Sequence, residues 1–368
     1  VFTDAGNPDN VDATSGIAKI YYNKKEYGTA VKYYNDIIEK FPKDPIGHGG
    51  ILSTYIEMWK KDNNPQYVLN HHRQLRNALD IESDLSMAVL AKLASFYIGL
   101  DSEDVRIKYN INPEDQVSGM EIDDNVEYLL NIIYGKEYGN RFAEGFYQRA
   151  RFYFKIKEAS RALKQLELAA TYDSRHYLAV LLMAEYYMKV ENYEQARSLL
   201  AEAESRYSIH RPELGERDED ETLLEGQPGR INYNLGKMAF LESAGINKVD
   251  NIRDYPGKKI YPSRSLGKLS EEETQRRNGL FVAQEEFKKA IDPERGILTD
   301  ASLMREVNFY LGWIDYNHNE FASALDYWAE LPEEDIYNNA TVLLGKGNSF
   351  YYTKQYNAAL GNYLKLKE

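Results

Sequence analysis

The residues of this sequence whose types could do chemistry are its histidines and one glycine–lysine cluster. His71 and His72 are adjacent, and neighbouring side chains on a helix point about 100° apart, so they cannot chelate a metal as a pair spaced four residues apart can. We interpret both as polar helix surface. Gly345, Lys346 and Gly347 lack the spacing of a phosphate-binding loop. The other candidate histidines each stand alone, at His176, His210 and His318.

No set of residues in the sequence pairs a nucleophile with a base. Carboxylates are numerous, but the chain has 58 acidic residues, so close pairs are expected by chance. The sequence contains no cysteine, which excludes disulfides, thiolate catalysis and cysteine-based zinc sites. We therefore predict a protein that is not an enzyme and that holds no metal or cofactor.

The charge balance limits the class of partner. With 45 basic and 58 acidic residues the net charge is −13, whereas a general binder of duplex DNA or phosphate groups needs a basic face. We expect protein partners and no nucleic acid. The longest apolar run, residues 178–184, is far shorter than the roughly 18 residues of a membrane span, so the sequence predicts no direct span.

Cysteine usage and the first residue bear on the compartment. Complete absence of cysteine over 368 residues favours an exported bacterial protein, in the periplasm or envelope, over a cytoplasmic one. The chain begins at Val1 rather than at Met, so we interpret it as a mature or excised fragment, in which a removed signal peptide leaves no trace.

The elements that must position any site repeat along the chain. Two copies of one pattern lie in register between residues 143 and 208, and their members are 34 residues apart. Small residues let two helices cross closely, and large residues fill the space around the crossing. The matched residues are Ala150, Tyr153, Ala162, Leu166 and Ala169 in the first copy, and Ala184, Tyr187, Ala196, Leu200 and Ala203 in the second.

This period and pattern resemble the tetratricopeptide repeat (TPR), a helix–turn–helix unit of about 34 residues. The best single copy lies near the start, with Tyr21, Tyr27, Ala30, Tyr34 and the closing Pro42 at the TPR offsets. The resemblance implies an all-α, right-handed solenoid of antiparallel helix pairs. More faintly, this long, acidic, tyrosine-rich chain is similar to bacterial envelope TPR scaffolds, including the flagellar collar proteins of spirochaetes.

We divide the chain after residue 140. Residues 1–140 hold the first TPR and degenerate helical repeats, and residues 141–368 hold a C-terminal TPR array. In that array Leu235 and Gly236 mark a first helix, but the matching Ala283 and Phe287 come about 35 residues late. A long loop insertion at about residues 245–277 therefore interrupts one repeat, and such insertions often lie on the binding face.

Two further copies follow, and the first of them contains an unusual carboxylate. Asp315 occupies the half-buried offset at which other copies carry Tyr21, Tyr153 or Tyr187. Either the carboxylate is buried, and then needs polar partners or a raised pKa, or the helix is rotated and Tyr316 fills the space. Of these two interpretations we favour the rotated helix.

The TPR resemblance also implies a concave groove lined by the first helices of the repeats. Rings and cations dominate the offsets concerned, which suits a docked helix or an extended peptide, because rings offer a large contact area at low entropic cost. The alternative is that the rings pack on one another inside a tightly wound superhelix. The groove residues are Tyr22, Tyr147, Arg151, Phe154, Tyr233, Lys237, Phe240, Phe309, Trp313, Tyr316 and Tyr351.

Chaperone-binding TPR domains carry a Lys/Asn clamp for an acidic peptide terminus, and this sequence departs from that pattern. One clamp offset reads Ser15, Leu181 and Leu344 in three of the copies, with rings in the others. The resemblance therefore does not imply a receptor for chaperone tails.

The insertion is basic and carries tyrosines and prolines, whereas the loop before it, residues 213–225, is acidic. The two loops could pair with each other or serve as separate docking surfaces. Exposed ion pairs contribute only about 0–1 kcal/mol, and a long loop within a compact array is more often functional. We predict that the insertion binds an acidic surface of a protein partner, through Arg253, Tyr255, Lys258, Lys259, Tyr261, Arg264 and Lys268.

Taken together, these features predict a non-enzymatic protein–protein interaction scaffold that assembles a multiprotein complex through its groove and its insertion. Two alternatives stay open. One is an envelope or periplasmic component of a flagellar collar assembly, and the other is a protein that binds a small ligand in the aromatic groove.

Overall fold

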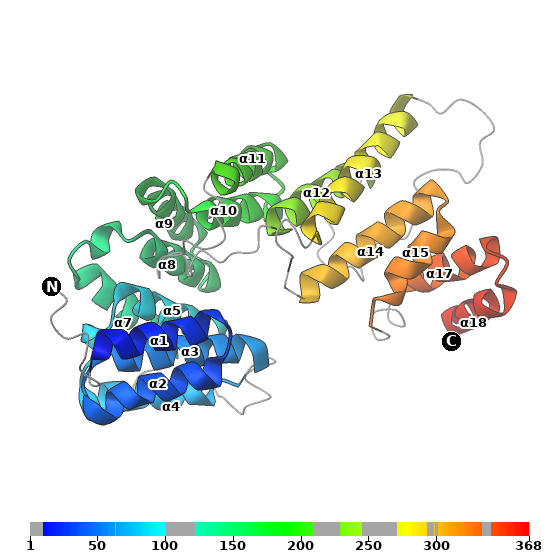
Figure 1. The fold of residues 1–368 in the computed structure, drawn as a ribbon. Helices are drawn as coiled ribbons and strands as arrows, with labels where there is room; N and C mark the ends of the chain where they lie inside the picture. The colour runs from blue at the N-terminus through cyan, green and yellow to red at the C-terminus, as the bar shows by residue number, and fades with distance from the viewer. Residues whose placement is uncertain are drawn as a thin grey trace. The chain divides into compact units, whose positions relative to one another are not determined.

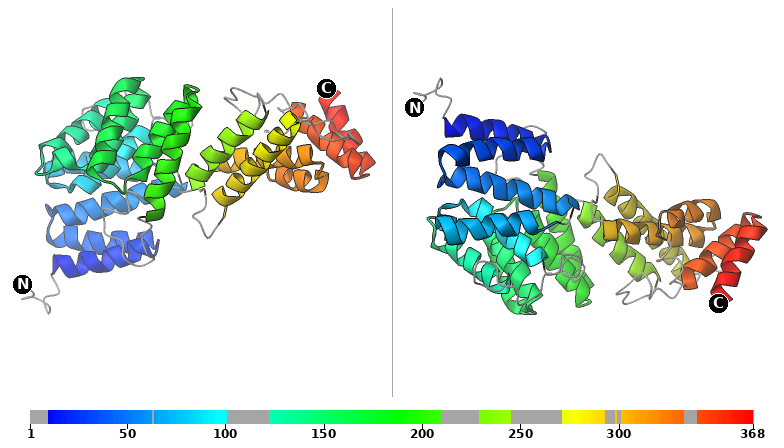
Figure 2. Two further views of the ribbon diagram at one scale, coloured as in Figure 1. Left: turned by 90° about the horizontal axis from the view of Figure 1, so that it is seen from above. Right: turned by 90° about the horizontal axis from the view of Figure 1, so that it is seen from below.

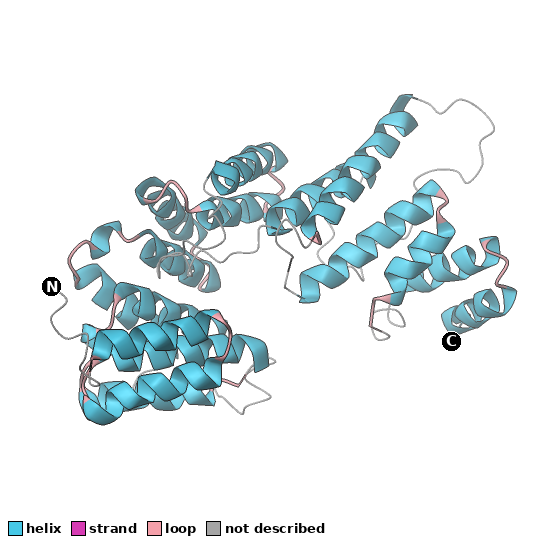
Figure 3. Cartoon of the chain, in the orientation of Figure 1, coloured by secondary structure: helices cyan, strands magenta, loops and turns pink. Residues whose placement is uncertain are grey.

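The structure is a computed structural model, and no strand occurs in the part of the chain that it describes (Figure 1, Figure 3). The described residues are 10–62, 64–100, 122–209, 229–244, 271–292, 298, 301–332 and 340–367. They divide into two compact units, one running up to Ala179 and the other from Val180 onward. No helix within these ranges has the combination of length and apolar composition that a bilayer crossing requires.

The first unit is a series of antiparallel helix pairs, with short turns η1 (Leu75–Leu79), η2 (Glu82–Asp84) and η3 (Gly139–Arg141) between them. The pairs are α1 (Val11–Asn23) with α2 (Tyr27–Lys40), α3 (Pro45–Asp62) with α4 (Gln66–Gln74), α5 (Met87–Gly99) with α7 (Ile122–Gly135), and α8 (Ala143–Lys155) with α9 (Ala159–Tyr172). The degenerate repeat that follows the first TPR is thus still a helix pair, α3 with α4.

The second unit continues the same arrangement, and the division between the units falls within α10. Its helices are α10 (Tyr177–Lys189) and α11 (Tyr193–Ile209), α12 (Gly229–Ala244) and α13 (Glu271–Ala290), α14 (Ala301–His318) and α15 (Phe321–Ala329), and α17 (Ala340–Tyr352) and α18 (Tyr356–Lys367). The pair α12 and α13 lies side by side in both views of Figure 2. Each unit is therefore a stack of helix pairs, which is the all-α solenoid architecture that the sequence predicts.

The insertion is shorter at its C-terminal side than the sequence analysis places it. Helix α13 begins at Glu271, so residues 271–277 are helical. The seven predicted contact residues between Arg253 and Lys268, and the acidic loop at 213–225, lie outside the described residues. The domain boundary predicted after residue 140 stays a prediction.

In five of the pairs, a small residue in the first helix is matched in size to a residue in the second helix. Where the second helix presents a leucine, at Leu166 or Leu200, the first helix carries alanine, at Ala150 or Ala184, and all four are fully buried. These buried small residues mark the crossing position of each pair. Close packing at this point leaves room for one methyl group and one branched side chain.

In three of the later pairs the second helix presents a ring and the crossing position is glycine. A Cβ atom on these glycines would lie between 2.2 and 2.9 Å from the nearest ring atom, which is inside van der Waals contact. Glycine is therefore required because the ring occupies the space of its missing side chain. The pairs are Gly236 with Phe287, Gly312 with Trp328, and Gly347 with Tyr363.

The turn inside the helix pair has one geometry in five pairs. In the first, the N–H of Lys25 donates to Tyr22 O and the N–H of Glu26 donates to Tyr21 O, both at 2.9 Å. This is the Schellman arrangement, which satisfies the last carbonyl groups of the first helix. It requires a left-handed residue, and here that residue is never glycine: Lys25, Lys157, Glu191, Asn319 and Lys354 have φ between 62° and 67°.

The crossing positions predict a mutational result that tests the fold. Ala196 is fully buried in α11, whereas Ala201 is exposed on the same helix. We expect Ala196→Glu to lower the free energy of unfolding by more than about 3 kcal/mol, because it buries a carboxylate with no partner. The matched control, Ala201→Glu, should be near neutral. Urea unfolding followed by circular dichroism measures both, and equal midpoints would contradict the assigned packing.

Candidate functional site

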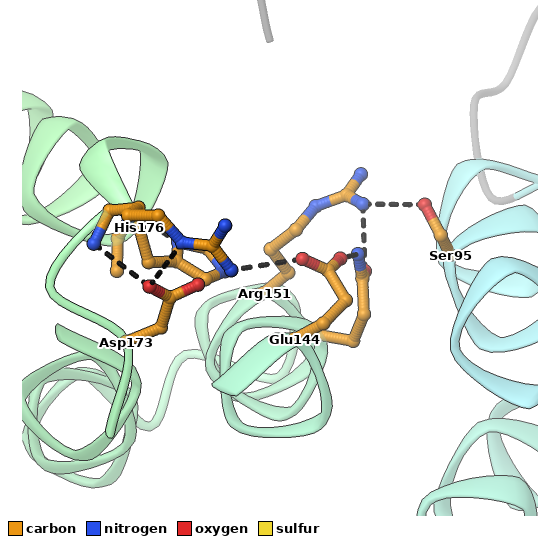
Figure 4. Close-up of polar contacts among 8 residues, drawn as sticks. Ser95, Glu144, Arg151, Asp173 and His176 are labelled. Atoms are coloured by element: carbon orange, nitrogen blue, oxygen red, sulfur yellow. Dashed lines mark hydrogen bonds and ion pairs between the residues drawn. The ribbon is translucent and has the colours of Figure 1, made fainter. Parts of the chain in front are cut away.

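A polar network joins α5 and α8 in the first unit (Figure 4). Arg151 Nη1 donates to the Ser95 hydroxyl at 2.7 Å and to Gln148 Oε1 at 2.8 Å. Gln148 Nε2 in turn donates to Glu144 Oε1 at 2.5 Å. Glu144 and Gln148 are buried, whereas Arg151 is half-buried. The network therefore connects a buried carboxylate with a guanidinium at the surface.

His176 extends this network toward the start of α10, and its neighbours select one tautomer. The backbone N–H of Ala179 donates to His176 Nδ1 at 3.2 Å, so this nitrogen acts as an acceptor. The proton therefore lies on Nε2, which donates to Glu144 Oε2 at 3.1 Å. The sequence analysis treats His176 as an isolated residue, and the structure shows that a buried carboxylate 32 residues earlier is its partner.

A second network joins α10 and α12 in the second unit. Arg230 Nη2 donates to both carboxylate oxygens of Glu185, at 2.7 and 2.8 Å. Asn234 Nδ2 also donates to Glu185 Oε1, at 3.1 Å. Two groups that extend from α12 thus converge on one carboxylate of α10, and hydrogen bonds between charged groups are among the stronger polar contacts in proteins.

The same helix, α12, is tied to α14 by a third carboxylate. The Tyr233 hydroxyl donates to Glu306 Oε2 at 2.5 Å, and Lys237 Nζ lies 3.1 Å from that oxygen. Burial, followed by the negative charge of Glu306, raises the pKa of Tyr233, so the phenol keeps its proton and stays a donor.

The networks of the two units use the same offsets of the first helix. In each network three residues of the first helix take part. The first lies six residues before the crossing position, the second four residues after the first, and the third three residues after the second. We call these residues, with their carboxylate partners, the polar ladder. In α8 they are Glu144, Gln148 and Arg151, and in α12 they are Arg230, Asn234 and Lys237. Their residue types differ, but in both helices the face that they form bonds to the neighbouring first helix.

The ladder remains accessible in the second unit. The side chains of Arg230 and Glu185 keep 33% and 22% of their surface exposed, and those of Lys237 and Glu306 keep 21% and 24%. These charges are therefore paired with each other and still in reach of a molecule at the surface.

The structure separates the eleven predicted groove residues by burial. Six rings are buried: Tyr147, Tyr233, Phe240, Phe309, Trp313 and Tyr316. Four residues are half-buried, namely Tyr22, Arg151, Phe154 and Lys237, and Tyr351 is 55% exposed. The six buried rings thus pack inside the solenoid, whereas the other five residues keep part of their surface accessible. Their role as partner contacts stays a prediction.

The buried rings are core because helices close tightly on them, both within a pair and between successive pairs. The Trp313 ring lies edge-on to Trp328 of its own pair with centroids 5.1 Å apart, and Phe240 packs on Tyr310 of the next pair at 4.8 Å. An offset within the repeat predicts which face a side chain occupies, but the distance to the next pair decides whether that face is open.

His72 is fully buried, so its interpretation as polar helix surface is wrong. Its Nε2 contacts Glu82 Oε1, and its Nδ1 lies 2.5 Å from the Tyr97 hydroxyl. Arg76 donates from Nε and Nη2 to the two oxygens of Glu82, each at 2.8 Å. Burial raises the pKa of Glu82, but the hydrogen bonds from His72 and Arg76 outweigh it, and the net shift is downward.

His71 is half-buried beside a second histidine. His48 Nε2 lies 2.9 Å from the carbonyl oxygen of Pro42 and must donate to it, so His48 Nδ1 accepts from His71 Nε2 at 3.2 Å. Burial, together with the nearby His48 and His72, lowers the pKa of His71 to about 4. Within the described residues, no three His, Asp or Glu side chains converge as a metal site would require.

Asp315 is buried with polar partners, and the interpretation of a rotated helix is wrong. Its carboxylate accepts from Gln284 Nε2 at 2.6 Å and from the Ser323 hydroxyl. Tyr316 is buried as well and accepts from Asn348 Nδ2 at 2.8 Å. Burial raises the pKa of Asp315, and the hydrogen bond from Ser323 opposes that shift.

Comparison with protein families identifies the repeat unit. Residues 2–45 match the model of the tetratricopeptide repeat family, and this segment contains the pair α1 and α2. The crossing positions and the five equal turns repeat the same helix-pair geometry in the later pairs, so the fold is a solenoid of the tetratricopeptide-repeat type. The search of curated proteins gave no match.

Several solved structures have similar folds at low sequence identity. A chain of the APC/C hetero-tetramer Cut9–Hcn1 is 12% identical with a TM-score of 0.46, and the match covers 99% of this chain and 54% of that one. The human IFIT1 dimer with PPP-AAAA is 16% identical, with a TM-score of 0.38 and coverage of 93% and 68%. The P58(IPK) TPR domain is 12% identical, with a TM-score of 0.29 and coverage of 97% and 92%.

This chain thus spans about half the length of the Cut9–Hcn1 chain that it matches. At such identities and TM-scores, no activity or partner of these proteins is carried over to this chain.

The environment of Asp315 predicts how stability depends on its charge. Because its folded-state pKa is raised, the wild type loses stability as the pH rises above about 4, where the carboxyl ionises in the unfolded state. Asp315→Asn keeps an acceptor for Gln284 and offers Ser323 a donor. We expect this variant to be at least as stable as the wild type at pH 7, with an advantage that shrinks toward pH 4.

The control for this prediction is Asp315→Leu, which leaves Gln284 and Ser323 without their acceptor and should cost about 1–3 kcal/mol. Urea unfolding at several pH values measures both variants. An Asn variant as unstable at pH 7 as the Leu variant would show that the charge itself is required.

Proposed function

We propose that this chain is a non-enzymatic scaffold that binds other proteins through the polar ladder and the half-buried rings beside it. Tetratricopeptide repeats generally present extended surfaces for protein partners. The observation that carries the proposal is the partial exposure of the ladder in the second unit: its charges there are held in fixed positions by their pairing, yet each keeps part of its surface accessible.

Fixed polar groups suit recognition of an extended peptide or a docked helix. A partner that hydrogen-bonds to a side chain already held in place loses little additional conformational entropy on binding. Apolar contact area is available nearby, because Phe154 is half-buried on α8 three residues after Arg151. On α1 the half-buried Tyr22 has Lys92 Nζ 5.5 Å from its ring centroid, which places a cation beside a ring at the surface.

Single-site cross-linking tests this function, because the chain has no cysteine and any introduced thiol is unique. We expect the full chain with Phe154→Cys or Tyr351→Cys, carrying a photoactivatable label, to form covalent adducts with defined proteins in extracts of the source organism. Mass spectrometry identifies both the protein and the segment attached.

The matched control is Lys164→Cys, an exposed position on the second helix α9. The same adducts in equal yield from Lys164→Cys would contradict the assignment to the first-helix face. Thermal stabilisation by small metabolites, together with no protein adduct from any position, would favour the small-ligand alternative instead.

We also propose that the insertion supplies a second contact, through its basic and tyrosine residues, with an acidic partner surface. The support is its composition and its place between two helices that pack directly on each other, α12 and α13. Two helices joined in this way do not need a long connection for their own packing.

Deleting residues 247–270 and bridging the ends with a short Gly/Ser linker tests that contact. Helix content and the melting temperature should stay nearly unchanged, while capture of the partner should weaken most at low salt, because long-range steering by basic residues is screened as salt rises. If the deletion instead unfolds the C-terminal helix pairs, so that helix content falls, the insertion is structural.

A further inference from the structure

Three of the described first helices carry a glycine at the same offset, and in two of them a ring fills the space above it. Tyr34 of α2 lies 2.2 Å from the position of a Cβ atom on Gly50 in α3. Trp328 of α15 lies 2.7 Å from that position on Gly345 in α17. In both cases the ring comes from the preceding helix pair. Above Gly16, in α1, no side chain lies within 4 Å.

The residues beside Gly16 are exposed where their counterparts in the next repeat are core. Ile17 and Ile20 are 41% and 55% exposed, whereas Ile51 and Thr54, at the same offsets 34 residues later, are 1% and 0% exposed. Ile51 belongs to the core cluster that the first helix pair forms with α3. Helix α1 thus presents the face that α3 buries against a preceding pair, and this face is uncovered among the described residues.

Helix α18 presents the opposite half of the same interface. The rings above Gly50 and Gly345 stand four residues after the crossing alanine of their helix, and in α18 that position holds Tyr363. Leu360 is 56% exposed and Leu364 is 53% exposed. The counterpart of Leu360 in α15, where α17 packs on the helix, is Leu325, which is half-buried.

We propose that a second copy of this chain docks at these two faces, with α18 of one copy on α1 of the next. Tyr363 would lie over Gly16 of the next copy, as Trp328 lies over Gly345 within the chain. Leu360 and Leu364 would meet Ile17 and Ile20. The occupant is a second copy because the contact continues the interface between successive pairs, and both complementary halves lie on this chain.

A contact of this kind is heterologous, since different faces of the two copies meet. Each docked copy offers α1 at one side and α18 at the other, so further copies can add in an open row or in a closed ring. Self-association should therefore be reversible and should extend beyond the dimer as concentration rises.

Sedimentation equilibrium of the full chain measures this association. Gly16→Phe fills the space that the ring of the next copy needs, and it should weaken association at least about tenfold. The open space above Gly16 lets α1 accept the larger side chain. Leu360→Glu should weaken association similarly, because it places a charge in an apolar contact.

Gly28→Phe is the matched control, because Gly28 is an exposed helical glycine of α2 that likewise has no side chain within 4 Å. It should associate like the wild type. A chain that stays monomeric at all concentrations, or an association that neither Gly16→Phe nor Leu360→Glu weakens, overturns the proposal.

Cross-linking decides the orientation. A chain with Gly16→Cys mixed with a chain with Leu360→Cys should form a heterodimer with a short bismaleimide, whereas Gly28→Cys mixed with Leu360→Cys should not. Efficient cross-linking of the Leu360→Cys chain with itself would show a tail-to-tail contact and would also overturn the proposal.

Discussion

The structure depends on how closely the two helices of each pair cross. The volume available at the crossing is divided between one residue of each helix, so alanine is found opposite Leu166 and Leu200, and glycine opposite Phe287, Trp328 and Tyr363. This close approach requires a short connection, and the Schellman turn supplies it at the cost of about 1–2 kcal/mol for each left-handed residue that is not glycine. The polar ladder, and the glycines at Gly16, Gly50 and Gly345, lie at fixed offsets from these crossing positions.

Much of this architecture could be predicted from the sequence, because crossing residues are a local pattern with a fixed period. Ala150, Ala162, Ala184 and Ala196 are all fully buried as the 34-residue register predicts. The burial of Phe309 and Trp313 could not be predicted in the same way. Their offset places them on the face of the first helix, but whether that face is open depends on how closely the next pair packs.

The polar contacts were harder to predict for a related reason. Asp315, His176 and Asn348 each bond to a residue of a neighbouring helix pair 31 or 32 residues away, at Gln284, Glu144 and Tyr316 respectively. This separation is slightly shorter than the repeat, so a comparison of equivalent offsets does not align the partners. A search for complementary polar residues about 32 positions apart would have found them. The network of His72, with Glu82 and Tyr97, follows no such period, because it lies in the least regular pairs of the chain.

The five equal turns have a mechanical consequence. Because each helix pair contacts chiefly its neighbours, a chain pulled from its two ends is a series of similar elements that can open one at a time. Opening one pair frees about 34 residues, which extend to roughly 12 nm at about 3.6 Å per residue. The crossings hold together the two helices of one pair. Arg230 and Lys237 of the ladder instead hold α12 to the first helices on either side of it. Under load, the array would lengthen in steps and recover its length when the crossings close again.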